Sequence, residues 1–203
     1  KGAIISSVVP ALNYTITHMC AGYLGVEPML VGAGIKTGHN LRVDDAREVG
    51  ADRIVNDVAA IRKYGAPPIV IDFGTATTFN AINEKGEFIG GAVAPGMRGS
   101  LDSLVSGTAK LPRVEIETPK SVIGKNTTTN LQAGLVFGFA GLVDYIVKKT
   151  KREMKLPDIQ VVATGGFSGI IAKEVGCIDH VDKLLTLQGL KYLYDLNCSE
   201  GKK

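Results

Sequence analysis

A short acidic turn, Asp-Phe-Gly-Thr at residues 72–75, carries the residues best suited to phosphate chemistry. The apolar, β-branched run at residues 69–71 predicts a buried strand before the turn, and a second strand follows it. Backbone N–H groups and a hydroxyl at Gly74 and Thr75 suit phosphate oxygens, and the carboxylate of Asp72 can hold a cation directly or through water. The turn indicates nucleotide handling, although an aspartate that only closes a turn explains these four residues equally well.

A second carboxylate stands at the start of a predicted helix. Residues 50–53 read Gly-Ala-Asp-Arg, and apolar residues at helical spacing follow until Gly65, which is placed to end the helix. By position alone, Asp52 is an N-cap that accepts backbone N–H bonds. The other interpretation makes Asp52 the base that takes a proton from an attacking hydroxyl in phosphoryl transfer. Arg53 could then grip a substrate carboxylate with two hydrogen bonds, and its alternative is a surface salt bridge.

Two further segments place small or hydroxyl-bearing residues at predicted element boundaries. Gly165 and Gly166 turn a predicted strand into a helix, and glycine there allows a ligand to approach the backbone. The hydroxyl-rich segment 121–130 precedes the longest predicted helix, where Thr127 is suited to helix capping or to ligand binding. Each segment by itself is a weak signal of a site.

The strands and helices predicted around these residues indicate an α/β protein. The β-α-β order at the start favours parallel strands with a right-handed crossover. Gly134, Gly138 and Gly141 in the longest helix predict close approach of another element. Residues 180–185 are expected to be a connecting segment. Strands are predicted at 3–9, 28–31, 69–71, 76–83, 88–94 and 159–163, and helices at 10–24, 52–64, 97–106, 131–155, 170–175 and 188–197.

Composition excludes several classes of protein. The chain has 203 residues, of which 45% are hydrophobic and 21% charged, so a packed core is expected rather than disorder. A net charge of +3 argues against nucleic-acid binding as the main function. Three widely spaced cysteines fit neither a disulfide framework nor a zinc site and predict a reducing, cytoplasmic setting. No apolar run predicts a membrane span. His18, His39 and His180 are scattered, without partners that predict a metal site or a triad.

Four segments together resemble the type III pantothenate kinases of the actin, Hsp70 and sugar kinase superfamily. They are VDDAREVGADRIVNDVAA at 43–60, IDFGTATTFNAINEKGEFIGGAVAPG at 71–96, SVIGKNTTTN at 121–130 and ATGG at 163–166. The resemblance covers nearly the whole chain. Three residues depart from the family pattern: Val43 stands in place of an aromatic residue, Ala46 in place of proline, and Asn80 in place of aspartate.

The resemblance implies a fold, a reaction and partners. The fold is α/β, with duplicated ribonuclease-H-like domains of the actin-like ATPase type, mixed sheets and flanking helices. The reaction is ATP-dependent phosphorylation of pantothenate to 4'-phosphopantothenate, the first step of coenzyme A biosynthesis. Mg²⁺ should accompany ATP, as in phosphoryl transfer generally. The resemblance adds a monovalent cation, K⁺ or NH₄⁺, and a homodimer that uses part of the longest helix.

The resemblance also assigns roles to single residues. Asp52 is the catalytic base, and Asp72 is the metal residue. The substrate-binding residues are Val43, Gly50, Ala51, Asp52, Arg53 and Thr127. The nucleotide-binding residues are Gly74, Thr75, Gly165 and Gly166.

We expect two domains. Residues 1–66 would form an incomplete first ribonuclease-H-like domain whose N-terminal strands are missing from the chain, and residues 67–203 the second domain. Two other functions stay open on the same fold. One is phosphorylation of a different small molecule. A kinase of that kind would not need the Gly-Ala-Asp-Arg motif at 50–53 together with the segment 121–130. The other is a non-catalytic regulator of the transcriptional accessory factor type.

Overall fold

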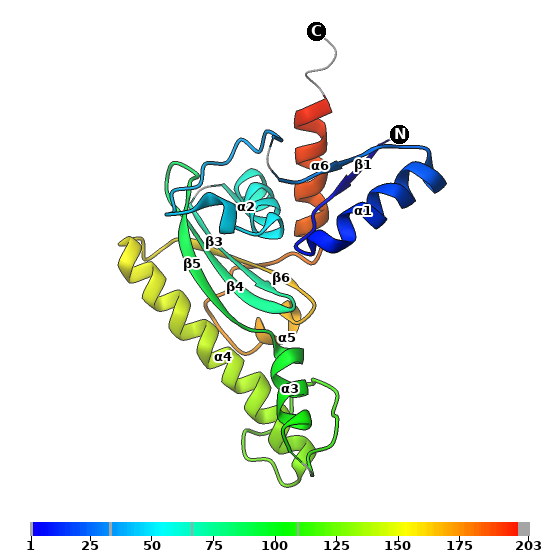
Figure 1. The fold of residues 1–203 in the computed structure, drawn as a ribbon. Coiled ribbons are helices and arrows are strands. Elements are labelled where there is room, and N and C mark those ends of the chain that lie inside the picture. The colour runs from blue at the N-terminus through cyan, green and yellow to red at the C-terminus, as the bar shows by residue number, and fades with distance from the viewer. Residues whose placement is uncertain (1, 33, 66, 109, 199–203) are drawn as a thin grey trace. The chain divides into compact units, whose positions relative to one another are not determined.

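The computed structural model describes residues 2–32, 34–65, 67–108 and 110–198, which divide into two units (Figure 1). Unit 1 comprises Lys1–Ala66, Ile82–Gly90 and Leu184–Lys203, and unit 2 comprises Pro67–Ala81 and Gly91–Lys183. The C-terminal helix therefore groups with unit 1, whereas the sequence analysis assigned it to the second domain. Its packing against another helix of unit 1 explains this grouping, as described below.

Unit 2 is built on a mixed five-stranded sheet in the order β5-β4-β3-β6-β7. The strands are β3 (Pro68–Phe73), β4 (Ala76–Ile82), β5 (Phe88–Pro95), β6 (Gln160–Gly165) and β7 (His180–Val181). β4 is antiparallel to β3, whereas β6 runs parallel to β3 and β7 parallel to β6. A hairpin-linked trio followed by two parallel strands agrees with the ribonuclease-H-like order that the resemblance implies. The prediction of an α/β fold with a mixed sheet and flanking helices is confirmed. β7 lies in a segment predicted as a connection, because two residues are too few to show strand periodicity.

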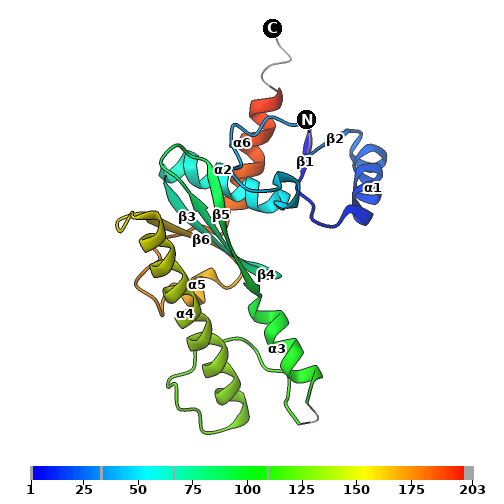
Figure 2. The same ribbon diagram turned by 60° about the vertical axis from the view of Figure 1, so that its left-hand side comes forward.

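The core of unit 2 lies between this sheet and its helices. All but one residue of β3 are buried, as expected for a central strand that is covered on both faces. The helices are α3 (Met97–Ser106), α4 (Thr127–Met154) and α5 (Ser168–Ile171). Figures 1 and 2 show α4 running along one face of the sheet, and its residues Val136 and Val143 join Ile71 and Val161 in one apolar cluster.

The long helix α4 begins four residues earlier than predicted. Asn126 is its N-cap and accepts the backbone N–H of Thr129 at 2.9 Å, and the Thr129 side chain bonds back to the cap residue. This reciprocal capping extends the helix into the hydroxyl-rich segment. Among the described residues, α4 is the one helix with the length and apolarity of a membrane span, with a window of mean hydropathy 1.4. A share of 33% of that window is buried, and most of the buried residues of α4 belong to the apolar cluster of unit 2.

Unit 1 opens with a parallel β-α-β arrangement. β1 (Ala3–Ile5) pairs with β2 (Pro28–Leu30), and α1 (Pro10–Met19) and the π-helical η1 (Cys20–Leu24) connect them. β1 is shorter than predicted because the hydroxyl of Ser7 accepts the backbone N–H of Val9 at 3.2 Å, which replaces extended pairing by a local turn.

The core of unit 1 lies between the helices α2 (Ala51–Tyr64) and α6 (Leu185–Cys198). Val55 and Val58 of α2 pack with Leu193 of α6 in one buried cluster. The helices approach closely at Gly189, where an added Cβ would lie 2.1 Å from the carbonyl oxygen of Val55. This packing places α6 in unit 1. A short 3-10 turn, η2 (Ala46–Glu48), precedes α2.

Candidate functional site

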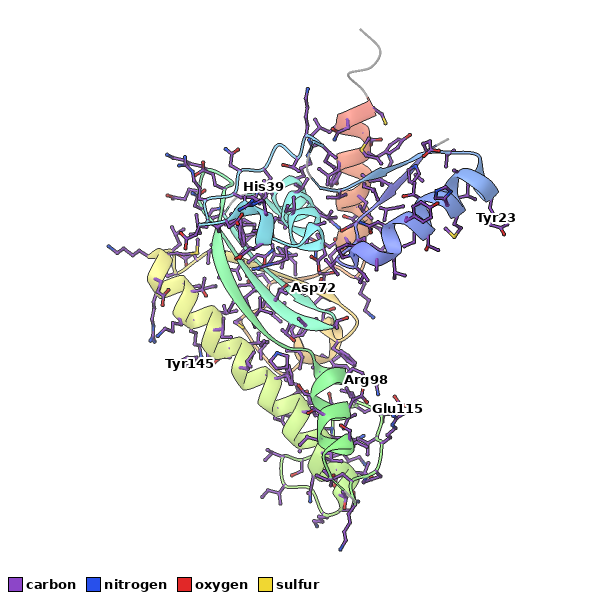
Figure 3. All side chains as sticks on the ribbon, in the orientation of Figure 1. Tyr23, His39, Asp72, Arg98, Glu115 and Tyr145 are labelled. Carbon is purple, nitrogen blue, oxygen red and sulfur yellow. The ribbon has the colours of Figure 1, made fainter. Side chains whose placement is uncertain are left out.

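In unit 2, the carboxylate of Asp72 lies beside two glycines that the sequence analysis singled out. Asp72 is near the end of β3, opposite Thr164 of the parallel strand β6 (Figure 3). A Cβ added to Gly165 would lie 2.6 Å from Asp72 Oδ1, and one added to Gly74 would lie 3.7 Å away. The predicted metal residue and two predicted nucleotide-binding residues therefore meet at the carboxyl ends of β3 and β6. Open α/β sheets bind their ligands at this end.

The turn after β6 requires glycine at one position and not at the next. Gly165 has φ +90°, and an added Cβ would also meet the carbonyl oxygen of Phe73 at 2.6 Å. The hydroxyl of Ser168 donates to the carbonyl oxygen of Gly165 at 2.7 Å, which fixes the turn. Gly166 is exposed, and a Cβ added there would meet nothing within 4 Å. Gly165 thus shapes the turn, whereas Gly166 leaves open space.

The exposed turn at Gly74 and Thr75 is supported by Gly96, which sequence analysis treated only as the end of a strand. A Cβ on Gly96 would lie 2.2 Å from the carbonyl oxygen of Thr75 and 2.6 Å from that of Gly74. The Thr77 hydroxyl donates to the carbonyl oxygen of Pro95 at 3.1 Å, close to the same point. In the sequence, the Pro-Gly pair directly after an apolar strand was the signal that could have revealed the role of Gly96.

In unit 1, Asp52 is the second residue of α2 rather than its N-cap. Gly50 occupies the cap position and has no side chain to offer. Asp52 Oδ1 accepts the backbone N–H of Arg53 at 2.9 Å. A Cβ on Gly50 would lie 2.5 Å from the same oxygen, so glycine leaves room for the carboxylate. The positive end of the helix dipole favours a negative charge in this first turn.

Arg53 is half-buried in the first turn of α2. Its guanidinium carbon lies 5.0 Å from the centre of the Phe88 ring, within the range of a cation–π contact. Burial lowers the pKa of Arg53, and the negative charges of Asp57 and Asp52 act in the opposite direction. Arg53 is therefore a partly desolvated cation beside two carboxylates.

The remaining predicted site residues differ in their burial and in their contacts. Ala51 packs against the core of unit 1, and Val43 is half-buried in the segment before α2. Thr127 is the first residue of α4 and is exposed, while Asn126 and Thr129 make the capping contacts. Figures 1 and 2 both show α4 beginning beside α3.

The sequence analysis missed one buried polar pair in unit 1. His39 Nε2 lies 3.3 Å from Asp57 Oδ2, and both side chains are buried. Asp57 follows Arg53 by one helical turn on α2. A charged residue among Val55, Val58 and other buried positions was the signal that could have revealed it, because buried charges need partners.

Replacing Gly165 by alanine should destabilise the protein, whereas replacing Gly166 should not. Alanine at residue 165 would carry a Cβ at a backbone position with positive φ, where it would collide with Asp72. We expect a loss of about 1–3 kcal/mol in the free energy of unfolding. Gly166→Ala is the matched control and should stay within about 0.5 kcal/mol of the parent. Chemical denaturation measures both values. Equal stability of the two variants would contradict the role given to Gly165.

Comparisons with known proteins agree on a family. A family model described as type III pantothenate kinase matches residues 1–149. A type III pantothenate kinase from Moorella thermoacetica is 52% identical over 197 residues, which cover 97% of this chain and 77% of that protein. A solved structure described as a Baf family transcriptional activator from Campylobacter jejuni has a TM-score of 0.67, with 17% identity, over 98% of this chain and 84% of that one. At that identity the likeness shows the fold alone.

The family assignment therefore rests on sequence identity over nearly the whole chain, and the solved structure agrees with the fold. The carboxylate turns of both units lie in segments that this identity spans. The chain belongs to the type III pantothenate kinase family.

Proposed function

We propose that this protein phosphorylates pantothenate with ATP to give 4'-phosphopantothenate, the entry to coenzyme A biosynthesis, through the residue roles set out below. The observation that carries the reaction is the 52% identity to a type III pantothenate kinase over 97% of the chain. Phosphoryl transfer needs an aligned hydroxyl, a group that takes its proton, and positive charge around the phosphates. The chain offers residues for each of these three requirements.

Asp52 acts as the general base in this proposal. Its carboxylate is held in the first turn of α2 by the backbone N–H of Arg53 through Oδ1. A fixed carboxylate oriented by backbone contact can accept the proton of the pantothenate hydroxyl as it attacks the γ-phosphate. Gly50 is part of the same arrangement, since any larger residue would crowd Oδ1.

Arg53 binds the pantothenate carboxylate in this proposal. A guanidinium offers two parallel N–H donors to a carboxylate, and partial burial strengthens such a contact. Phe88 supports the guanidinium from one side. Ala51, Val43 and Thr127 complete the proposed substrate contacts through family resemblance.

Asp72 holds a monovalent cation, K⁺ or NH₄⁺, close to the nucleotide phosphates in this proposal. The residues fit such an ion, because the carboxylate stands at a strand end next to the exposed backbone of Gly74 and Thr75. Mg²⁺ would bind mainly through the phosphates of ATP, as it often does in kinases. When bound, the cations supply positive charge to the transferring phosphoryl group. Gly165 and Gly166 provide the backbone turn for the nucleoside part.

The protein acts as a cytoplasmic homodimer in this proposal. The row of Gly134, Gly138 and Gly141 on α4 is exposed, and a Cβ added to any of them meets nothing within 4 Å in the described part of the chain. Tyr145 continues this face and is 67% exposed (Figure 3). Glycines lower helix stability unless something packs on them, so a second copy of α4 is a suitable partner.

Replacing Asp52 by asparagine should abolish most turnover and little else. Asparagine keeps the oxygen that accepts the Arg53 N–H but cannot take up a proton, so kcat should fall about 10²–10⁴-fold. ATP affinity and the melting temperature should stay near the parent values. The assay is ATP consumption with pantothenate by the full-length enzyme. Near-parental turnover would remove Asp52 from the role of base.

Replacing Asp72 by alanine should weaken ATP binding and remove its dependence on K⁺. The lost carboxylate leaves the cation without its charged ligand, so affinity should fall about tenfold in K⁺ buffer. Calorimetric titration with ATP, in K⁺ and in a bulky organic cation, measures this difference. Asp158→Ala, at an exposed position of unit 2, is the matched control. An unchanged response to K⁺ would refute the cation site.

Sedimentation at micromolar concentration should give a dimer. Gly138→Leu should shift the protein towards monomer without lowering its melting temperature, since the added side chain meets only open space within one chain. Lys149→Leu adds the same side chain at another exposed position of α4 and should leave the dimer intact. A monomeric parent protein, or equal behaviour of both variants, would exclude this interface.

A further inference from the structure

His39 and Asp57 form a buried pair in unit 1 that the proposed catalytic roles do not use. His39 Nε2 lies 3.3 Å from Asp57 Oδ2, and the two side chains are 1% and 0% exposed. The other ring nitrogen, Nδ1, lies 2.9 Å from the carbonyl oxygen of Gly86. Figure 3 shows His39 beside α2, on the segment that leads towards that helix. One imidazole thus contacts α2 and the turn between β4 and β5.

Hydrogen-bond chemistry makes both contacts of His39 attractive. A carbonyl oxygen only accepts, so Nδ1 carries a hydrogen and donates to Gly86. Nε2 lies within hydrogen-bond distance of Asp57 Oδ2, at 3.3 Å. Buried polar groups that are satisfied in this way hold their elements in a single arrangement.

The pair holds a wall that consists of residues 39–42 and 83–88. Phe88 N–H donates to the carbonyl oxygen of Asn40 at 2.9 Å, and Arg42 N–H donates to that of Phe88 at 2.8 Å. Within the turn, the Asn83 side chain accepts the backbone N–H of Glu87 and donates to the Glu87 carboxylate. Arg42 Nε donates to the other oxygen of that carboxylate at 3.1 Å. The wall is therefore one bonded unit, and His39 fastens it to α2.

The wall carries the aromatic ring on which Arg53 rests. Phe88 is buried, and its ring centre is 5.0 Å from the guanidinium carbon of Arg53. An arginine side chain has many rotamers, and holding it in one of them before substrate arrives lowers the entropy loss on binding. Any loosening of the wall would therefore act on the substrate through Arg53.

We propose that His39 and Asp57 are positioning residues for pantothenate binding, which clamp the wall to α2 and thereby hold Phe88 against Arg53. The inference deepens the proposed function and rests on the role of Arg53 in binding the substrate carboxylate. Neither positioning residue touches the substrate. Their effect is confined to the affinity for the carboxylate end of pantothenate, so it should appear in KM for pantothenate and not in kcat or in KM for ATP.

The test begins with His39→Leu in the full-length enzyme. Leucine fills similar space but cannot hydrogen-bond to Gly86 or to Asp57, so KM for pantothenate should rise about tenfold. KM for ATP and kcat should stay within about twofold. His18→Leu is the matched control, because His18 is exposed on α1, and it should behave as the parent. An unchanged KM for pantothenate in folded His39→Leu would overturn the inference.

A second variant keeps the test decisive if His39→Leu does not fold. Phe88→Leu removes the ring under Arg53 while the His39–Asp57 pair stays in place, and it should raise KM for pantothenate to a similar extent. Parental KM in Phe88→Leu would count against a clamp that acts through Phe88.

A second substrate separates positioning from general damage. Pantothenyl alcohol has CH₂OH in place of the carboxylate, so it lacks the group that Arg53 binds. His39→Leu should raise KM for pantothenate but leave KM for the alcohol near the parent value, whereas a purely structural defect would raise both.

Arg53→Gln separates failure of this inference from failure of the proposed function. A raised KM for pantothenate in Arg53→Gln, together with no change in His39→Leu, would overturn only the positioning role. An unchanged KM in Arg53→Gln would overturn the role of Arg53 and this inference with it.

Discussion

The parallel pairing of β3 with β6 is the constraint on which the chemistry of unit 2 depends. Their register sets Asp72 opposite Thr164 and Phe73 opposite Gly165, so an acidic side chain and a glycine turn end at the same edge. Side chains alternate between the two faces of a strand, and a slip by one residue would turn Asp72 to the other face. The apolar contacts of Ile71 and α4 exclude that slip, because they fix which residues face the core.

The two carboxylates with proposed catalytic roles occupy different kinds of backbone position. Asp52 lies in the first turn of a helix, where unpaired N–H groups and the helix dipole stabilise its charge. Asp72 stands at the end of a buried strand, where the sheet opens into exposed turns. In both places a neighbouring glycine, Gly50 or Gly165, would meet the carboxylate if it carried a Cβ. Glycine, which has no side chain, therefore leaves the space that each carboxylate occupies.

The sequence predicted the local elements well and their long-range contacts poorly. The strand before Asp72 has a local signal in its apolar run, and the end of α2 has one in its glycine. This strand and this helix formed as expected. The packing of α6 on α2 depends on a contact between residues 55 and 189. No local pattern encodes such a contact. His39 was missed for the same reason, since its two partners are distant along the chain.

The contact between Asp72 and Gly165 also links the evolution of two positions that are far apart in sequence. Because an added Cβ at residue 165 would fall on the Asp72 carboxylate, a larger residue there is compatible only with a smaller or displaced group at residue 72. Homologous chains should accordingly keep glycine and aspartate at these positions together or lose them together. The pair can serve as a sequence marker that separates chains with an intact turn from relatives that kept only the scaffold.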